Sequence, residues 1–153
     1  MDLRSYLERQ GVLYQASQHP TVYTAQELAQ CEHVPGRQVI KPVVVKADGQ
    51  FLMCALPANC RIDLDKLREE IHAKDVDLVD EPKLSELFPQ CELGAEPPVG
   101  MMFDMPMVMD ESVLNDERVT FQAGSHRDAV TMTIDDFCRI NDAARICRFS
   151  RPA

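Results

Sequence analysis

The sequence lacks the long apolar run that a membrane span requires, since no uninterrupted stretch approaches roughly 20 hydrophobic residues. Its first residues, Met1-Asp2-Leu3-Arg4-Ser5-Tyr6, also lack the apolar segment of a secretion signal. These two absences argue against a membrane partner. We therefore expect a protein of the cytoplasm.

Cysteine pairs with metal-binding spacing are also absent. No two of the six cysteines are separated by the two to four residues typical of zinc sites. Their positions are Cys31, Cys54, Cys60, Cys91, Cys138 and Cys147. The spacing therefore argues against a structural zinc site and, without an export signal, predicts six reduced thiols. We expect no metal and no other cofactor.

Positive charge is scarce. Lys and Arg number 16 against 25 Asp and Glu, a formal net charge of -9, whereas proteins that hold nucleic acid by bulk electrostatics normally have a basic surface. The acidic excess lies in residues 65–117, which carry 15 acidic and 4 basic side chains; the remainder carries 10 and 12. This distribution argues against DNA as a partner and restricts any contact with RNA to the surface formed by the two chain ends.

The length of 153 residues, with 45% hydrophobic and 27% charged residues, fits one globular domain over residues 1–153. Helical periodicity and capping residues such as Thr24 and Asp63 predict helices at residues 2–10, 24–32, 64–71, 82–88 and 133–147. Apolar and β-branched runs predict strands at residues 39–47, 51–56, 76–79, 101–109, 118–123 and 129–133. Asp48-Gly49 predicts a hairpin between the first two strands. The order favours an α/β (mixed α+β) domain with a mixed β-sheet flanked by helices.

A lysine stands inside the most apolar strand. The period of two places Lys41 on the same face as Val39, Val43 and Val45. Because lysine is rarely buried without a partner, this placement suggests a concave site that receives an anion. An edge strand whose lysine reaches into water explains the pattern equally well, and Pro42 favours such an edge.

Two turns carry further candidate residues. In Gly94-Ala95-Glu96-Pro97-Pro98-Val99-Gly100, two glycines bracket a rigid Pro-Pro pair, and such a loop can direct the N–H groups of Gly94 and Ala95 at an oxyanion. Ala123-Gly124-Ser125-His126 fits a tight turn between two strands with a histidine at its mouth.

Several catalytic motifs are missing. The sequence contains no Gly-rich phosphate loop, no His-Glu-x-x-His and no Gly-x-Ser-x-Gly. A cysteine nucleophile, Cys60 or Cys91 paired with His126, stays open as an alternative, since such residues can converge from anywhere in a chain.

Taken together, these segments resemble a YbaK-type domain, the family that includes the editing domain inserted in bacterial prolyl-tRNA synthetases. The resemblance extends from about His19 to Phe137. It rests on His19-Pro20, Tyr23-Thr24-Ala25-Gln26-Glu27, Lys41 with Val43-Val44-Val45, Leu56-Pro57-Ala58, Gly94-Ala95-Glu96-Pro97-Pro98 and Phe121-Gln122-Ala123-Gly124-Ser125-His126.

The resemblance implies a single domain with a barrel-like mixed sheet and an aminoacyl-tRNA deacylase activity on mischarged tRNA. It implies a catalytic role for Lys41, in the pocket that receives the terminal adenosine and its aminoacyl group. The substrate-binding residues that it implies are His19, Thr24, Gly94, Ala95, Glu96, Pro97, Pro98, Gly124, Ser125 and His126. Because RNA is read mainly at single-stranded ends, an acidic domain of this kind is expected to take the tRNA 3′ end and to borrow affinity from an aminoacyl-tRNA synthetase partner.

One position departs from the family. Relatives often carry a small polar residue after the lysine, where this chain has Pro42. The departure leaves amino-acid specificity open and supports a second reading, a catalytically silent binding module for an aminoacyl-tRNA 3′ end or a nucleotide-like ligand.

Overall fold

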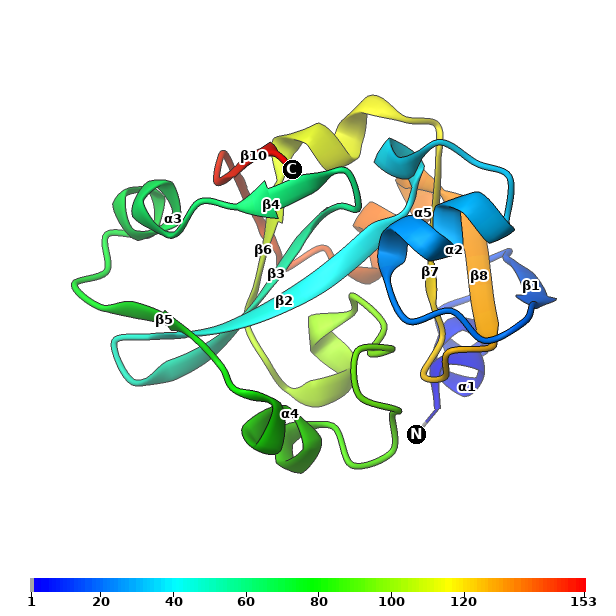
Figure 1. The fold of residues 1–153 in the computed structure, drawn as a ribbon, viewed down its shortest axis with the longest axis horizontal. Coiled ribbons are helices and arrows are strands. Elements are labelled where there is room, and N and C mark those ends of the chain that lie inside the picture. The colour runs from blue at the N-terminus through cyan, green and yellow to red at the C-terminus, as the bar shows by residue number, and fades with distance from the viewer. Residues whose placement is uncertain (1) are drawn as a thin grey trace.

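The computed structural model describes residues 2–153 as a mixed α/β domain (Figure 1). Its helices are α1 (Leu3–Arg9), α2 (Ala25–Cys31), α3 (Leu64–Glu70), α4 (Glu81–Leu87) and α5 (Ile134–Ile140). Short 3₁₀ helices cover Gly36–Gln38, Gly100–Phe103 and Glu111–Asn115. No helix within residues 2–153 has the length and apolarity to cross a membrane.

The strands form three sheets. They are β1 (Gln15–Gln18), β2 (Ile40–Ala47), β3 (Gln50–Pro57), β4 (Cys60–Ile62), β5 (Val76–Leu78), β6 (Met107–Asp110), β7 (Arg118–Gln122), β8 (Asp128–Thr133), β9 (Arg145–Cys147) and β10 (Ser150–Pro152). The largest sheet has the order β5-β2-β3-β6-β9, with β6 parallel to both of its neighbours; the others are β1-β8-β7 and β10-β4. The mixed sheet is thus confirmed, but these sheets do not close into a barrel, so the barrel-like closure expected from the resemblance is wrong.

The β2–β3 hairpin forms as its turn residues predict. Ala47 pairs with Gln50 across a two-residue loop in which Asp48 and Gly49 both have positive φ, 47° and 86°. This is the backbone of a type I′ turn, whose twist matches that of the strands. The long hairpin forms the central part of the largest sheet.

Both faces of this sheet are covered. On one face Ile40, Val44 and Met53 pack with Phe121 and Phe137 in the main core. On the other face the buried apolar side chains include Val45, Cys54, Leu56, Leu67 and Phe149. Burial raises the pKa of the Cys54 thiol, which behaves as a small apolar side chain.

Two sequence predictions are wrong in extent. The strand predicted at residues 101–109 begins only at Met107, because a 3₁₀ helix covers Gly100–Phe103 and Asp104 adopts a left-handed conformation with φ of 50°. The helix predicted at residues 133–147 ends at Ile140, and the chain then forms β9. The short strands β1, β4, β9 and β10 were not predicted, since polar and charged residues interrupt their alternation.

Candidate functional site

A cavity of about 510 Å³ lies along the side of β2 that β5 leaves open. Because β5 pairs only with residues 45–47, residues 40–43 have a strand neighbour on one side, β3. Seventeen residues line the cavity: Thr24, Ala25, Gln26, Leu28, Val39, Ile40, Lys41, Pro42, Val43, Val44, Ala58, Leu78, Val79, Leu84, Gly94, Glu96 and Gln122. Most are apolar, and Lys41 and Glu96 are the two charged members.

Lys41 is half-buried in this cavity, as the concave-site reading of its strand expects. Burial lowers the pKa of its ammonium group from the usual 10.5, and a weaker interaction with Cys60 opposes this shift. Within residues 2–153 the ammonium group forms no ion pair. Lys41 therefore offers an unneutralised positive charge to a ligand.

Pro42 lies at the open side of β2. Its ring lacks an N–H, which a strand tolerates where no neighbour needs that donor. The edge-strand reading is therefore also correct at this point, since the same segment is both an open edge and a cavity wall.

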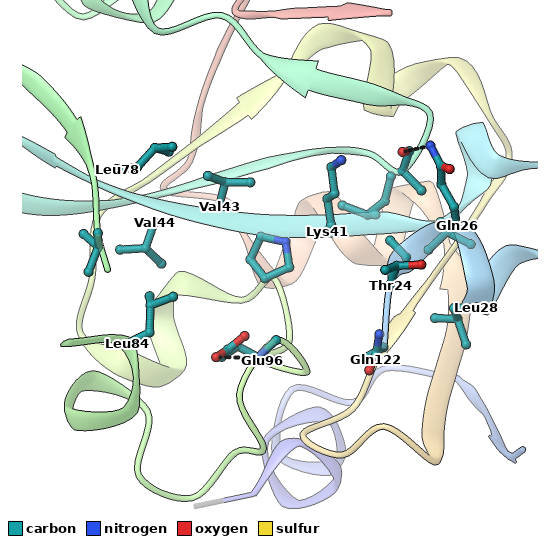
Figure 2. Close-up of a pocket in the computed structure, with 17 residues that line it drawn as sticks. Thr24, Gln26, Leu28, Lys41, Val43, Val44, Leu78, Leu84, Glu96 and Gln122 are labelled. Atoms are coloured by element: carbon teal, nitrogen blue, oxygen red, sulfur yellow. Dashed lines mark hydrogen bonds between the residues drawn. The ribbon is translucent and has the colours of Figure 1, made fainter. Parts of the chain in front are cut away.

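The two charges of the cavity lie on opposite sides of β2. Figure 2 shows Lys41 and Val43 on one side of the strand, and Glu96 with Leu84 on the other. The cavity thus extends around the open edge of the strand. A ligand that spans it meets a cation at one end and a carboxylate at the other.

The loop at residues 94–98 forms the Glu96 side of the cavity. Gly94 adopts φ of 87°, and its N–H donates to Oε1 of the buried Glu96 at 3.2 Å. The N–H of Ala95 donates to the Glu92 carbonyl at 3.0 Å. Both donors are thus used inside the loop, so the expectation that they aim at an oxyanion is wrong for this conformation.

His126 is buried beneath this loop and does not line the cavity. Its Nε2 donates to the Leu93 carbonyl at 2.7 Å, and its Nδ1 lies 3.2 Å from Oε1 of Gln122. The His126 N–H donates to the Glu92 carboxylate at 3.0 Å. The structure therefore places His126 as a residue that positions the loop and Gln122, not at the mouth of the turn as expected.

Gly124 and Ser125 complete the turn without reaching the cavity. Gly124 adopts φ of 94° and donates its N–H to the Ala95 carbonyl at 2.8 Å. The Ser125 hydroxyl donates to Asp128 at 2.6 Å. These contacts join the turn to the loop and to β8.

His19 and Thr24 differ in their placement. Thr24 lines the cavity and caps α2 in a capping box with Glu27. His19 is buried outside the lining, with Nδ1 2.8 Å from the Pro20 carbonyl and Nε2 without a partner within the described residues.

Of the residues expected at the site, the structure brings four to the cavity wall: Lys41, Thr24, Gly94 and Glu96. The others do not line the cavity: His19, Ala95, Pro97, Pro98, Gly124, Ser125 and His126. Sequence reasoning missed Gln26 and Gln122 as lining residues. For Gln122, the available signal was a polar side chain inside the apolar strand 118–123.

The cysteine-nucleophile alternative is contradicted by the contacts of its members. Burial, and secondarily Glu96, raises the pKa of Cys91 to about 11, which keeps the thiol protonated. Both ring nitrogens of His126 face Leu93 and Gln122 instead of a thiol. Across residues 2–153, no group of three or more His, Cys, Asp or Glu side chains is arranged to hold a metal ion.

The fold and the cavity define the class of this protein: a small mixed α/β domain with a cavity of two opposite charges at an open strand edge. The family profile for aminoacyl-tRNA editing domains matches residues 19–140. The chain therefore belongs to the aminoacyl-tRNA editing domain family.

A known enzyme and two solved structures show similarity to the chain. This chain is 28% identical over 116 residues to the proline–tRNA ligase of Staphylococcus saprophyticus, and the match covers 67% of this chain and 20% of the ligase. The chain thus matches about a fifth of that enzyme's length.

The similar solved structures establish the fold. A protein described as a candidate trans-editing enzyme for prolyl-tRNA synthetase superposes with a TM-score of 0.86 at 21% identity, covering 97% of this chain and 94% of that one. A protein described as hypothetical has a TM-score of 0.87 at 18% identity, with 97% and 99% of the two chains covered.

Proposed function

We propose that the protein is an aminoacyl-tRNA deacylase that hydrolyses the ester of mischarged tRNA in trans. Membership of the editing-domain family supports this activity, and the description of one structural neighbour as a candidate trans-editing enzyme suggests a free-standing mode of action. The observation that carries the proposal is the unneutralised Lys41 ammonium in the 510 Å³ cavity.

The charges of the cavity complement those of the substrate. The aminoacyl end of a tRNA carries an α-ammonium group next to the ester and phosphates along the RNA. In this proposal Lys41, which lines the cavity, holds a phosphate or the oxyanion that forms as water attacks the ester, and Glu96, which also lines it, accepts from the α-ammonium group. Since the ester is already activated, positioning of water and stabilisation of this oxyanion supply the catalysis.

Affinity for a whole tRNA is expected to depend on a partner. A net charge of -9 opposes strong binding of RNA by the isolated domain. The similarity to a proline–tRNA ligase makes a prolyl-tRNA synthetase the partner that we propose, because a second binding surface raises the effective concentration of the tRNA at the pocket.

The test is deacylation of tRNAs charged with alanine, cysteine, serine or threonine. We expect Lys41→Ala to lower the rate by about 100-fold or more, the effect of removing one donor to a developing oxyanion. Lys46→Ala is the matched control, since Lys46 lies on the same strand but outside the cavity. Its Nζ lies 5.7 Å from the centroid of the Phe51 ring. Full activity of Lys41→Ala, or no ester loss above background with micromolar wild-type protein, contradicts the proposal.

Pro42 supports the second candidate, a binding module without turnover. The proline occupies the cavity wall beside Lys41, where relatives often carry a small polar residue. Binding of a non-hydrolysable amide analogue of an aminoacyl-tRNA end, with no turnover of the matching ester, identifies this function instead.

A further inference from the structure

Two arginines face each other across the ribbon formed by β4 and β10. The pairing places Arg61 directly opposite Arg151, and both side chains are exposed. Directly opposed residues of an antiparallel pair have Cβ atoms about 5 Å apart, and like charges at this position destabilise the pair. The ribbon thus concentrates two positive charges at a cost in stability.

Neither member of this pair forms a salt bridge within residues 2–153, where five other Lys and Arg side chains do so. Asp63 is the nearby acid: the N–H of Lys66 chiefly lowers its pKa, and Arg151 adds a smaller electrostatic effect. Oδ1 of Asp63 accepts from the N–H groups of Asp65 and Lys66 at the start of α3. Other arginines among the described residues also form no ion pair, but strand pairing sets Arg61 and Arg151 directly opposite each other.

The ribbon is held firmly at both ends. The buried Asp110 carboxylate accepts from the N–H groups of Phe149 and Ser150 at 2.8 and 2.9 Å. At the other end the N–H of Ala153 donates to the Asn59 carbonyl at 3.1 Å. The arginine pair is therefore presented by a fixed backbone, which lowers the entropy lost when it binds a ligand.

The ribbon begins beside the cavity. Ala58 lines the cavity two residues before β4, and Cys60, the first residue of β4, interacts electrostatically with Lys41. Figure 1 shows β4 and β10 along the same side of the molecule, with the C-terminus next to them. A polyanion whose end occupies the cavity therefore has a positively charged route out of it.

We propose that Arg61 and Arg151 bind the sugar-phosphate backbone of the RNA whose 3′ end enters the cavity. This inference rests on the proposed function, since it assigns the RNA surface of that site. A guanidinium group forms paired hydrogen bonds with phosphate oxygens, and a phosphate between the two side chains removes their mutual repulsion. The pair also lies outside the acidic segment, residues 65–117.

The test measures binding of an uncharged tRNA transcript to the full chain by fluorescence anisotropy over a salt series. Arg61→Gln/Arg151→Gln is expected to weaken binding about tenfold and to reduce the slope of log K against log salt by about two, one for each lost phosphate contact. Arg9→Gln is the matched control, because this exposed arginine lies on α1, far from β4 and β10 in Figure 1. The double variant Arg61→Lys/Arg151→Lys keeps both positive charges, so it should retain most of the wild-type slope of log K against log salt.

The outcomes separate this surface from the proposed activity. If the double variant binds tRNA as the wild type does, if Arg9→Gln weakens binding equally, or if the wild type does not bind tRNA, the arginine surface is refuted. A specific loss of RNA binding in a protein that hydrolyses no aminoacyl ester supports the surface and refutes the deacylase. With both correct, the double variant hydrolyses a small aminoacyl-nucleoside ester normally and shows a raised KM for charged tRNA.

Discussion

Lys41 carries a charge at a position where its neighbours along the strand are apolar. Burial lowers the pKa of its ammonium group from 10.5, so the charged form is disfavoured in the folded protein. Since the charge has no ion pair among the described residues, its burial lowers the stability of the folded protein, as expected if Lys41 has the ligand-binding role that we propose. Residues selected for function commonly have this property.

Lys41→Met should therefore stabilise the protein at pH 7. The expected gain is below about 1 kcal/mol, because the side chain is only partly buried and water screens its charge. The stability advantage of Lys41→Met should shrink as the pH rises through the lowered folded-state pKa towards 10.5. In this range the folded wild-type protein sheds the buried charge before the unfolded chain does, which removes the cost of burying it. Urea denaturation of both proteins at pH 7 and at alkaline pH measures this difference. An unchanged or lower stability at pH 7 contradicts the burial argument.

The loop at residues 94–98 and the turn at residues 124–126 act as one element. The loop supplies Gly94 and Glu96 to the cavity, and the turn holds the loop through His126 and the N–H of Gly124. A side-chain amide of Asn141, beyond the C-terminal end of α5, donates to the Pro98 carbonyl at 3.2 Å. The cavity wall is thus fixed by contacts from distant parts of the chain.

His126→Ala should loosen this element. Loss of the contacts to Leu93 and Gln122 leaves two polar groups without partners and costs about 2 kcal/mol. Amide hydrogen exchange should accelerate at residues 92–98 more than in the β2–β3 hairpin. His72→Asn is the control, since His72 is exposed and its φ of 56° suits asparagine. Unaltered exchange in the loop refutes the positioning role.

At the scale of the whole molecule, Asp110 joins the end of β6 to the C-terminal segment. Its buried carboxylate accepts from Ser112, Phe149 and Ser150. Burial raises the pKa of this carboxyl, but the combined hydrogen bonds outweigh it and hold the pKa below the usual 3.8. One side chain therefore connects the largest sheet to the β4–β10 ribbon.

Asp110→Asn should destabilise the protein by about 2 to 3 kcal/mol, because the new amide N–H₂ faces donors instead of accepting from them. In the wild type, the contribution of the charged carboxylate is complete above pH 3.8 and is lost as the pH falls through the lower folded-state pKa. The stability difference between the two proteins should therefore shrink below pH 3.8. Thermal unfolding from pH 7 to pH 2.5 tests this, with the exposed Asp77→Asn as control; a constant difference contradicts it.

Local signals in the sequence account for much of the fold. The Thr24–Glu27 capping box, the Asp63 cap and the Asp48-Gly49 turn each appear where the sequence predicts them. Each depends on residues within a few positions of one another, so the chemistry that forms it is readable from the chain. The alternation in β2 likewise predicted the face that carries Lys41, and Figure 2 shows Lys41 on the same side as Val43.

Contacts between segments that lie far apart in the chain could not be predicted from local sequence patterns. Strands β9 and β10 are short and polar, and β9 exists because Arg145–Cys147 pairs with β6, more than 30 residues earlier. The strand predicted at residues 101–109 is shortened by the 3₁₀ helix Gly100–Phe103, where the chain turns so tightly that a Cβ at Gly100 would lie 2.6 Å from the Met105 carbonyl oxygen. No local pattern encodes such pairings.

The candidate site also combines features that local sequence reveals with features that depend on contacts between distant segments. Lys41 and the Gly94–Pro98 loop were identifiable as candidates because an unusual residue type in an apolar strand, or a rigid loop composition, is a property of the chain itself. That His126 lies behind the loop, that Gln122 reaches the cavity and that Arg61 meets Arg151 follow from strand pairing and burial. Orientation and neighbourhood depend on how the sheets pack, and only the folded chain establishes them.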